Sequence, residues 1–312
     1  MGAGTYPRAN FLHDRSIIGA YTASASGDKI ITLARSTDNG VTWTEIGTAA
    51  RGPTATKEID NPYPFQLPSG RILVAYRNHD LQNGVYTFFR ITISYSDDNG
   101  ATWSYLSTPA SDPGPVNGNW EPFLRLAQDG SLQLYYSRET SSIDQDSLMR
   151  TSTDGGATWS TATTISGAEF TNVRDGMLGV AAVSVSNLIA VFESEQNGGP
   201  VSIHSITSAD DGKTWGNRQT VYTPTGSGTN AQAPQVISVG GTLVVSFQTD
   251  EDSPGSAVTK VVTSGDGGVT WGHKLTFSPA VSQWAGLMTL DASSFLALAA
   301  HGGAMVQKVT LS

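Results

Sequence analysis

The chain has 312 residues, of which 18 are basic and 27 acidic, so its formal net charge is −9. The acidic excess argues against a nucleic-acid partner, which requires a basic stripe, and no apolar run approaches the roughly 20 residues that span a membrane. Cysteine is absent, which excludes disulfides and thiol catalysis. With 34 glycines, 7 tryptophans and 14% charged residues, the composition is typical of an all-β protein.

Five copies of one motif, Ser-x-Asp-x-Gly-x-Thr-Trp, divide the chain. They begin at Ser36, Ser96, Ser152, Ser208 and Ser264, and they end at Trp43, Trp103, Trp159, Trp215 and Trp271. Successive tryptophans are 60, 56, 56 and 56 residues apart. A period of that length indicates that one supersecondary unit is repeated along the chain.

Each copy of the motif is predicted to form a tight turn between two strands. The aspartate accepts hydrogen bonds from backbone N–H groups, the glycine supplies a positive φ, and Thr and Trp begin the next strand. We therefore interpret the aspartates as structural. A stretch such as Asp97 to Gly100 lacks the alternating acids and the closing Glu of a calcium loop. The five histidines show no ligand spacing, so we expect no metal and no cofactor.

The strands of each repeat follow the same predicted order, in which two strands joined by a tight turn precede a third strand, the motif and a fourth strand. The second repeat has strands at residues 63–67, 72–77, 87–96 and 103–106. The third begins at 120–126, 132–137 and 148–152, the fourth at 177–183, 188–193 and 201–208, and the fifth at 234–239, 243–248 and 258–264. A sixth repeat, at 287–290, 295–301 and 305–311, has neither the motif nor a fourth strand.

Four antiparallel strands repeated about six times predict a six-bladed β-propeller formed by residues 1–312 as one domain. Radial closure protects the strand edges. We expect the sixth blade to borrow a strand from the N-terminus, where only residues 1–5 precede the first blade. A β-solenoid is the second choice, but the repeat is too long for one coil.

In a propeller, the starts of the first strands and the ends of the second strands meet at one mouth of the central funnel. Alignment of the repeats places Arg8, Asn61, Glu121, Arg174 with Asp175, Gln232 and Trp284 at first-strand starts, and Thr22, Arg77, Ser137, Glu193, Gln248 and His301 at second-strand ends. Asp60 and Glu139 are expected beside them. These residues differ from blade to blade, which is typical of one asymmetric site on a repetitive scaffold.

Two carboxylates that face each other across a funnel, here Glu121 and Glu193, can cleave a glycosidic bond as nucleophile and acid/base. Arginines such as Arg77, Arg138 and Arg174 can hold the glutamates or a sugar, and Trp120 and Trp284 offer stacking surfaces. It is equally consistent with the sequence that the two glutamates only pair with arginines. Glu139 is either a third carboxylate or, more in keeping with its neighbours, part of a salt bridge. His301 either binds sugar or fills space.

The repeated motif resembles the Asp-box of sialidases and related propellers, and this resemblance covers residues 6–312. A sialidase needs three arginines for the substrate carboxylate and a Tyr–Glu pair with its tyrosine in the last blade. Arg8 and Arg174 fit two of these arginines. However, Gln232 stands where another arginine is expected, no tyrosine follows Tyr222, and Trp284 lies near the required place.

The segments at 119–123, 135–137, 174–177 and 191–193 resemble blades three and four of the exo-arabinanases of glycoside hydrolase family 93. The resemblance implies a propeller in which Glu121 is the nucleophile and Glu193 the acid/base. It also implies retaining release of arabinobiose from the non-reducing end of α-1,5-linked arabinan. A tyrosine that assists the nucleophile is expected in this family, and the last blade lacks one.

We accordingly expect a secreted, monomeric enzyme that acts on an oligo- or polysaccharide and has no membrane partner. Insertions at 81–87, 108–119 and 140–146 are expected to be loops that close one end of the groove. Glu193 is expected to be protonated at rest, with its pKa raised by burial and a neighbouring carboxylate. The alternatives are a lectin-like propeller without catalysis, a sialidase-related hydrolase of another glycan, and a structural interaction propeller.

Overall fold

The computed structural model describes residues 1–311, and within that range every regular element is a β-strand. The all-β prediction is therefore confirmed. The first sheet contains β1 (Thr5–Phe11), β2 (Ile17–Ala25), β3 (Asp28–Ser36) and β4 (Thr44–Pro53), and the second contains β5 (Lys57–Gln66), β6 (Ile72–Gln82), β7 (Val85–Ser96) and β8 (Ser104–Pro113). In both sheets, strands that follow each other in sequence pair antiparallel.

The third sheet is twice as large, because two groups of four strands are joined in it. One group is β9 (Asn119–Leu126), β10 (Leu132–Ser141), β11 (Asp144–Ser152) and β12 (Thr163–Ser166), and the other is β13 (Val173–Ala182), β14 (Leu188–Gln196), β15 (Ser202–Ser208) and β16 (Gly216–Tyr222). A parallel bridge between Gln145 of β11 and Arg174 of β13 links the groups.

The remaining strands form a four-stranded and a three-stranded sheet. The former contains β17 (Ala231–Val239), β18 (Thr242–Thr249), β19 (Val258–Ser264) and β20 (Gly272–Ser278), and the latter contains β21 (Gln283–Thr289), β22 (Ser294–Ala300) and β23 (Ala304–Thr310). Because two strand groups share one sheet, the structure has five hydrogen-bonded sheets, and the number of blades stays a prediction.

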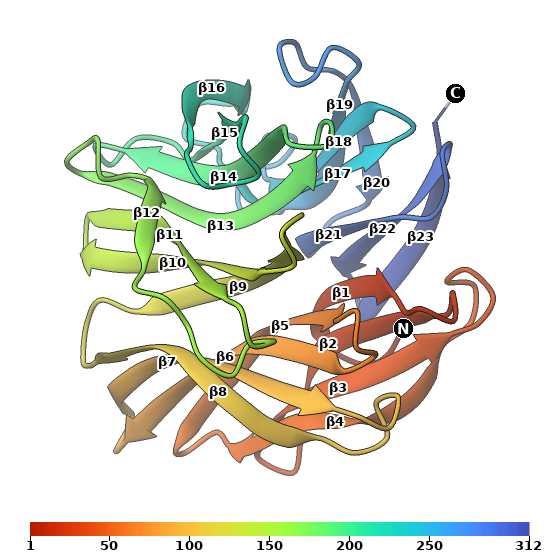
Figure 1. Ribbon diagram of the computed structural model, residues 1–312. Coiled ribbons are helices and arrows are strands. Elements are labelled where there is room, and N and C mark those ends of the chain that lie inside the picture. Colours follow the sequence, from red (N-terminus) through yellow and green to blue (C-terminus); the bar gives the residue numbers. More distant parts are fainter. Residues whose placement is uncertain (312) are drawn as a thin grey trace.

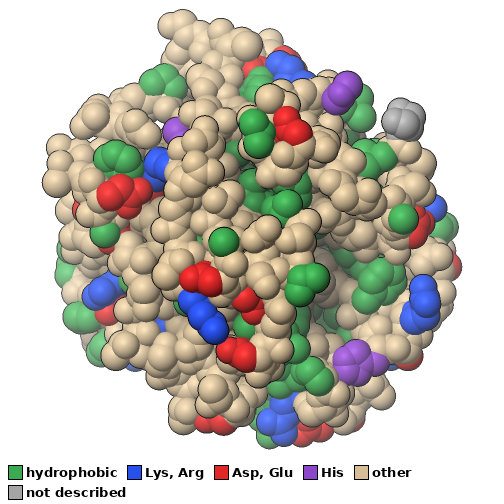
Figure 2. Space-filling view, turned by 45° about the horizontal axis from the view of Figure 1, so that its top comes forward, with side chains coloured by type: hydrophobic (Ala, Val, Ile, Leu, Met, Phe, Trp, Pro, Cys, Tyr) green, Lys and Arg blue, Asp and Glu red, His purple; other side chains and the backbone are tan. Residues whose placement is uncertain are grey.

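The sheets are arranged around a common centre, with the first strand of each group innermost (Figure 1). Each innermost strand contacts the next in the order β1, β5, β9, β13, β17 and β21, and β21 contacts β1 in turn. The innermost strands thus form a ring of packing contacts. Acidic and basic side chains are interspersed on the face shown in Figure 2, with no large area of one charge.

The hydrophobic core lies in layers between neighbouring sheets. In the layer between the first two sheets, Ile18 and Leu33 pack against Ile72 and Val74, and Trp103 of the second motif covers them. The tryptophans of the other motifs occupy the equivalent places in their own layers. Each motif tryptophan therefore packs against one of the core layers.

The turns formed by the motif have the predicted hydrogen bonds. In the third copy, Ser152 Oγ donates to Asp154 Oδ1 at 2.7 Å and accepts from the Gly156 N–H at 2.8 Å. The Thr158 N–H donates to Asp154 Oδ1 at 2.9 Å. The other four copies repeat this pattern. The aspartates are thus structural, as predicted.

The contact between the two ends of the ring is smaller than expected. Instead of a borrowed strand, the N-terminal residues contribute one isolated antiparallel bridge between Gly2 and Ala304. The Met1 amino group also donates to Ala304 O at 2.9 Å. Gly4 then passes close to the first sheet, where an added Cβ would lie 2.5 Å from Thr22 O. This close approach turns the chain into β1 before a longer ladder can form.

The three segments expected to be loops are largely strands, which corrects that prediction. β6 and β7 continue to a two-residue turn, where Gln82 pairs with Val85 across Asn83 and Gly84. Both turn residues have positive φ, 53° and 76°, as a tight hairpin requires. β8 likewise runs to Pro113, and Ser141 of β10 pairs with Asp144 of β11. The second sheet therefore extends beyond the mouth as a rigid hairpin.

Candidate active site

A β-bulge interrupts each innermost strand near the mouth. The register shifts by one residue at the same place in β1, β5, β9, β13, β17 and β21. At each bulge one residue other than glycine has a positive φ between 39° and 57°, namely Tyr6, Asn61, Glu121, Met177, Ala233 and Trp284. Left-handed backbone at such residues is strained and collects at functional sites. The bulges set these six residues at equivalent positions around the mouth.

This pattern corrects part of the sequence alignment. Asn61, Glu121 and Trp284 occupy the bulge positions, as expected. In β1 the equivalent residue is Tyr6 and not Arg8, and in β13 it is Met177 and not Arg174 or Asp175. In β17 it is Ala233 and not Gln232. The motif period supports these positions, because Glu121, Met177 and Ala233 follow each other at intervals of 56 residues, as the last three motif tryptophans do.

Glu121 and Glu193 line one cavity of about 280 Å³. Glu121 comes from the bulge of β9, and Glu193 from the mouth end of β14, where it pairs with Gly176 of β13. Both residues belong to the eight-stranded sheet. The other lining residues are Trp120, Glu139, Gln145, Arg174, Glu195, Val201 and Gln232.

Arg174 organises one wall of this cavity. Its Nη2 donates to Glu139 Oε1 at 2.6 Å and to Gln145 Oε1 at 3.0 Å. Glu139 also accepts the N–H of Gly118 at 2.8 Å. The interpretation of Glu139 as the partner of a neighbouring arginine agrees with this geometry. Because the pair is internally neutral, this wall carries little net charge.

Arg77, on the second sheet, contacts two acidic residues and Trp120. Its Nη2 lies 2.5 Å from Glu58 Oε1 and 3.5 Å from Asp60 Oδ2, and its guanidinium lies 4.9 Å from the centre of the Trp120 ring. Asp60 in turn accepts the hydroxyl of Thr22 at 2.6 Å. A guanidinium over a tryptophan face is favourable, so Arg77 and Trp120 hold each other in place beside Glu121.

Burial raises the pKa of both glutamates. The pKa of Glu121 rises to about 8, because burial outweighs the lowering effect of Arg77, and the carboxylates of Glu193, Glu139 and Asp60 raise it further. Burial likewise raises the pKa of Glu193 to about 7, against the N–H of Ala233 at 2.6 Å and the charge of Arg174. The expected rise for Glu193 is present, and its neighbouring carboxylate is Glu195. Burial thus favours protons on both groups near neutral pH.

Two aromatic residues, Tyr6 and Trp284, pack together at the mouth. Tyr6, Met177, Ala233 and Trp284 form one buried cluster, with the Tyr6 and Trp284 ring centres 5.7 Å apart. Burial raises the pKa of Tyr6, and Glu121 and Asp60 contribute to the rise. The sequence analysis looked for a tyrosine in the last blade, whereas the structure places one, from the first strand, in electrostatic range of Glu121.

Arg8 lies behind this cluster and does not line the cavity. It is buried, its guanidinium lies 4.1 Å from the Tyr6 ring centre, and its Nη1 donates to Trp284 O at 3.1 Å. The backbone N–H of Trp284 also donates to Gln248 Oε1 at 2.8 Å. Arg8 and Gln248 therefore position Trp284 and Tyr6.

Three other predicted residues face elsewhere. Arg138 pairs with Asp112 at 2.7 Å and lines a separate hollow with it. Asp175 is fully buried and accepts both arms of Arg218 at 2.6 and 2.8 Å. His301 makes a hydrogen bond to Val281 O at 3.0 Å through Nδ1. Asn61 is buried at its bulge beside Asp60, whose Oδ1 accepts its N–H at 2.8 Å.

Gln145, Glu195 and Val201 line the cavity without having been predicted. Glu195 follows Glu193 at a spacing of two on β14, so the alternation of a strand places both side chains on one face. That signal was available in the sequence. Gln145 reaches the cavity only because β11 bridges β13 at this point, which no local pattern indicates.

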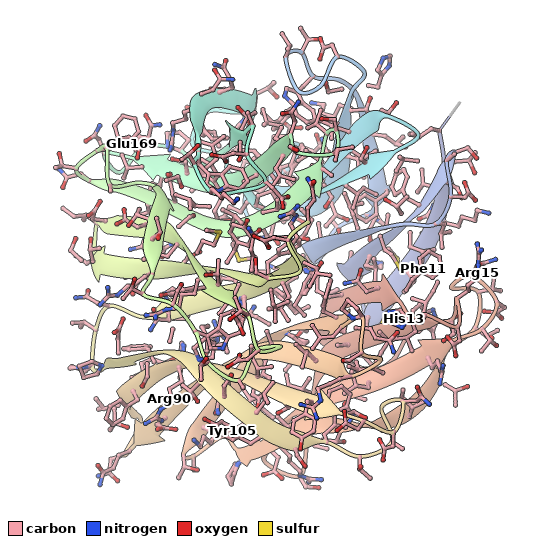
Figure 3. All side chains as sticks on the ribbon, in the orientation of Figure 1. Phe11, His13, Arg15, Arg90, Tyr105 and Glu169 are labelled. Carbon is pink, nitrogen blue, oxygen red and sulfur yellow. The ribbon has the colours of Figure 1, made fainter. Side chains whose placement is uncertain are left out.

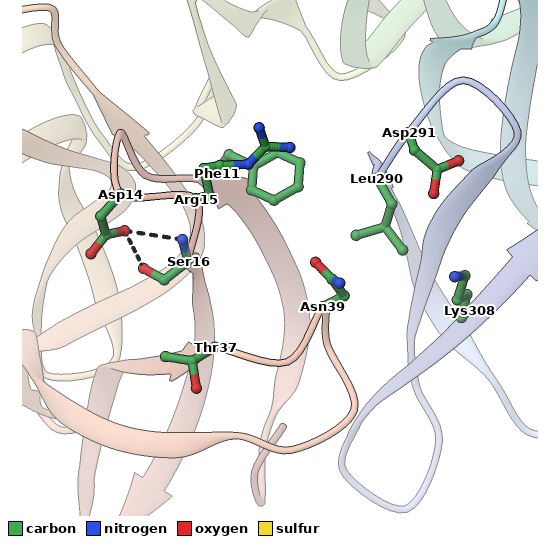
Figure 4. Close-up of a pocket in the computed structure, with 9 residues that line it drawn as sticks. All are labelled: Phe11, Asp14, Arg15, Ser16, Thr37, Asn39, Leu290, Asp291 and Lys308. Atoms are coloured by element: carbon green, nitrogen blue, oxygen red, sulfur yellow. Dashed lines mark hydrogen bonds between the residues drawn. The ribbon is translucent and has the colours of Figure 1, made fainter.

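A larger cavity, of about 460 Å³, lies at the opposite ends of the strands (Figure 4). It is lined by residues of the β1–β2 turn, such as Asp14 and Arg15, and by Asp291 and Lys308 of the last sheet. Phe11, His13 and Arg15 mark this end of the first sheet in Figure 3. Asp14 is already bonded to Ser16 and Arg35, so this cavity has no carboxyl pair comparable to Glu121 and Glu193.

Neither a metal site nor a membrane-spanning helix is present in residues 1–311. No group of three or more His, Asp or Glu side chains in that range is placed to hold a metal ion. No helix in the same range is long and apolar enough to cross a bilayer.

Several solved structures have a fold similar to that of this chain. The chain is 20% identical to a family 93 α-L-arabinofuranosidase of Fusarium graminearum in complex with arabinobiose, with a TM-score of 0.77 over 99% of this chain and 93% of that one. An α-L-arabinanase of Penicillium chrysogenum with arabinobiose is 18% identical, with a TM-score of 0.76 over 98% and 92%. The NanB sialidase of Streptococcus pneumoniae is 12% identical, with a TM-score of 0.67 over 95% and 65%. At these identities the likeness shows a shared sialidase-like fold.

Sequence-family comparison agrees with this fold. No curated protein matches the chain. A model of the BNR/Asp-box repeat matches residues 94–105, around the second motif. A model described as a BNR repeat-like domain matches residues 109–304, which is more than half of the 312 residues. The chain therefore belongs to the family of BNR repeat-like domains.

Proposed function

Starting from this family membership, we propose that the protein is a retaining glycoside hydrolase of α-1,5-linked arabinan that releases arabinobiose from the non-reducing end. The observation that carries the proposal is one cavity lined by two partly buried carboxyls of raised pKa, Glu121 and Glu193. Paired carboxyls with perturbed pKa values are typical of catalytic acids and bases. The likeness to an arabinofuranosidase and an arabinanase, both with arabinobiose, supports the choice of substrate.

The proposed reaction is a double displacement. The carboxylic acid of Glu193 gives its proton to the glycosidic oxygen while the carboxylate of Glu121 attacks the anomeric carbon, which forms a glycosyl ester and frees the leaving sugar. The carboxylate of Glu193 then takes a proton from water, whose oxygen attacks the anomeric carbon and releases Glu121. The pair must hold one proton between its two members at the start.

The assignment of roles follows the family resemblance. Burial raises the pKa of both carboxyls, to about 8 for Glu121 and to about 7 for Glu193, and because they interact they titrate as a pair. We keep Glu121 as the nucleophile because Arg77 is the strongest influence that favours its charged form. Tyr6 lies in electrostatic range of the same carboxyl.

The finer features of the fold belong to the same proposal. Counting the eight-stranded sheet as two blades gives a six-bladed propeller with an Asp-box in each of its first five blades, formed as a single domain. Arabinan is an extracellular polysaccharide, so we propose that the enzyme is secreted and acts as a monomer on its glycan.

Product analysis on debranched α-1,5-arabinan tests the proposal. The wild type should release arabinobiose with retained anomeric configuration, and Glu121→Gln and Glu193→Gln should not. If the wild type releases no sugar from arabinan but binds oligosaccharides, the lectin-like alternative replaces the enzyme.

Azide rescue of alanine variants on an activated aryl glycoside decides the two roles. Azide should give a glycosyl azide of retained configuration with Glu193→Ala and of inverted configuration with Glu121→Ala. The opposite pattern would exchange the two assignments.

A further inference from the structure

A second, larger hollow of about 600 Å³ adjoins the catalytic cavity. Trp120, Glu139 and Arg174 line both, so the two are continuous. The additional residues come from β7, from the segment between β8 and β9, and from the β10–β11 turn. We refer to this hollow as the aromatic groove. Its volume lies in the range of ligand-binding pockets, which measure about 300–1,000 Å³.

One wall of the aromatic groove is a platform of three rings, Tyr86, Phe89 and Trp120. The ring centres of Tyr86 and Phe89 are 4.8 Å apart and those of Phe89 and Trp120 6.1 Å apart. His79 packs behind all three at 4.8 to 5.6 Å. Phe89 is buried, and the planes of neighbouring rings are tilted by 37° and 51°. The partly exposed rings of Tyr86 and Trp120 are therefore separate surfaces, each of which can contact the apolar face of a sugar ring.

The platform is fixed in position before any ligand arrives. His79 is fully buried, its Nε2 lies 2.8 Å from Asn119 O, and burial lowers its pKa to about 3. It is therefore neutral, and because a carbonyl only accepts, Nε2 carries the proton. The Tyr86 hydroxyl donates to Glu58, which also pairs with Arg77. A rigid aromatic surface loses little entropy on binding.

The facing wall of the aromatic groove is polar but carries compensated charge. It presents Thr140, Ser141 and Ser142, beside the ion pair of Arg174 with Glu139. Arg174 Nη1 donates to Ser142 O at 3.2 Å and so ties the β10–β11 turn to the cavity. Hydroxyl groups opposite aromatic rings fit a neutral polyhydroxylated ligand better than an anion or a lipid.

From these two walls and their continuity with Glu121 and Glu193, we infer that the aromatic groove is a subsite that binds the continuation of a neutral glycan chain next to the cleaved bond. This inference rests on the proposed function for the identity of the sugar. It assigns Tyr86, a residue of the extended β6–β7 hairpin, a role in recognising longer substrates. The hairpin would otherwise be an unexplained extension of the second sheet.

Tyr86→Ala tests the inference against two matched variants. Tyr86→Phe keeps the ring and removes only the hydroxyl bonded to Glu58. Tyr105→Ala removes an exposed tyrosine from β8 of the same sheet, outside the groove and labelled in Figure 3. Thermal unfolding of all three shows whether the β6–β7 hairpin remains folded.

Kinetics on a series of arabino-oligosaccharides and on a short aryl arabinoside give the first readout. In the wild type, kcat/KM should rise with chain length. In Tyr86→Ala it should fall about tenfold on long chains and much less on the aryl substrate. Tyr86→Phe keeps the ring and loses only the bond to Glu58, so it should fall less than Tyr86→Ala, and Tyr105→Ala should resemble the wild type. An unchanged chain-length dependence in active Tyr86→Ala would overturn the inference and leave the proposed function intact.

Calorimetric binding of neutral oligosaccharides, including arabino-, xylo- and cello-oligosaccharides, gives a readout that does not need activity. Binding that is lost in Tyr86→Ala and kept in Tyr86→Phe supports the groove even if arabinan is not cleaved. If the wild type binds none of them, or if Tyr86→Ala binds them as well as the wild type, the inference is wrong.

Discussion

The two ends of the strands use carboxyl groups in opposite ways. At the outer turns, hydrogen bonds from Thr and Ser hydroxyls and backbone N–H groups lower the pKa of Asp38, Asp98, Asp154 and Asp210 to about 2. At the mouth, burial raises the pKa of Glu121 to about 8 and of Glu193 to about 7. Every copy of the turn has the same hydrogen-bond pattern, whereas the residues at the mouth differ from one strand group to the next. Carboxyl groups that accept several hydrogen bonds stabilise the turns, whereas carboxyl groups whose pKa is raised by burial can exchange protons near neutral pH.

The largest effect that would separate the two ends is on turnover. Glu121→Gln and Glu193→Gln should each lower kcat by about 10²-fold to 10⁴-fold, because each removes a proton-transfer or nucleophilic group. Asp98→Asn, at a turn, should leave kcat unchanged in the folded protein. The measurement is initial-rate kinetics on debranched arabinan. A comparable loss of kcat in Asp98→Asn would erase the distinction between the ends.

The pH dependence of kcat/KM should come from the mouth alone. One of the paired glutamates must be ionised and the other protonated, so the profile should be bell-shaped with its maximum near pH 7 to 8, between the pKa values of about 7 and about 8. Each limb should fall about tenfold per pH unit, and the limbs report the pair rather than single residues. A profile that stays flat from pH 5 to 9 would contradict the assignment.

Stability should depend on the turns. Ser152→Ala removes a buried hydroxyl that accepts the Gly156 N–H at 2.8 Å, and an unsatisfied buried N–H costs about 1–3 kcal/mol. The free energy of unfolding, from urea titration, should fall by that amount. The control is Ser24→Ala at an exposed position of β2, which should change little. Equal losses in the two variants would show that the turn bonds contribute nothing special.

The smallest expected effect is an increase in the free energy of unfolding when a glutamate at the mouth is replaced. The folded-state pKa values of about 8 and about 7 exceed the free value of 4.5, so between pH 4.5 and 8 the unfolded chain binds fewer protons than the folded one. The contribution of the two protonated glutamates to the free energy of unfolding is therefore fully present below pH 4.5, and it is lost as the pH rises through 7 and 8. Glu121→Gln should then be more stable than the wild type by at least about 1 kcal/mol at pH 8, with a smaller difference at pH 5. A difference that is independent of pH would argue against burial as the cause.

The sequence predicted the repeat and its turns well because both rest on local chemistry. Ser, Asp, Gly, Thr and Trp at fixed spacing specify hydrogen bonds within one turn, as the five copies show. The neighbourhood of Glu121 and Glu193 followed from aligning the repeats. The bulges did not, because a left-handed backbone conformation at residues other than glycine cannot be read from residue types, and so Arg8 was placed where the structure has Tyr6. The hairpin extension to Gln82 and Val85 was mistaken for a loop, although Asn83-Gly84 is a local signal for a two-residue hairpin turn.

The bridge between Gln145 and Arg174 has a mechanical consequence. Because it merges two strand groups, Glu121 and Glu193 belong to one continuous hydrogen-bonded sheet, whereas no other two neighbouring groups of residues 1–311 share a sheet. When the molecule fluctuates, the interfaces between separate sheets should open first, and the distance between the two carboxyl groups should change least. Heating or mild denaturant would then loosen the rim of the molecule well before it altered the spacing on which bond cleavage depends.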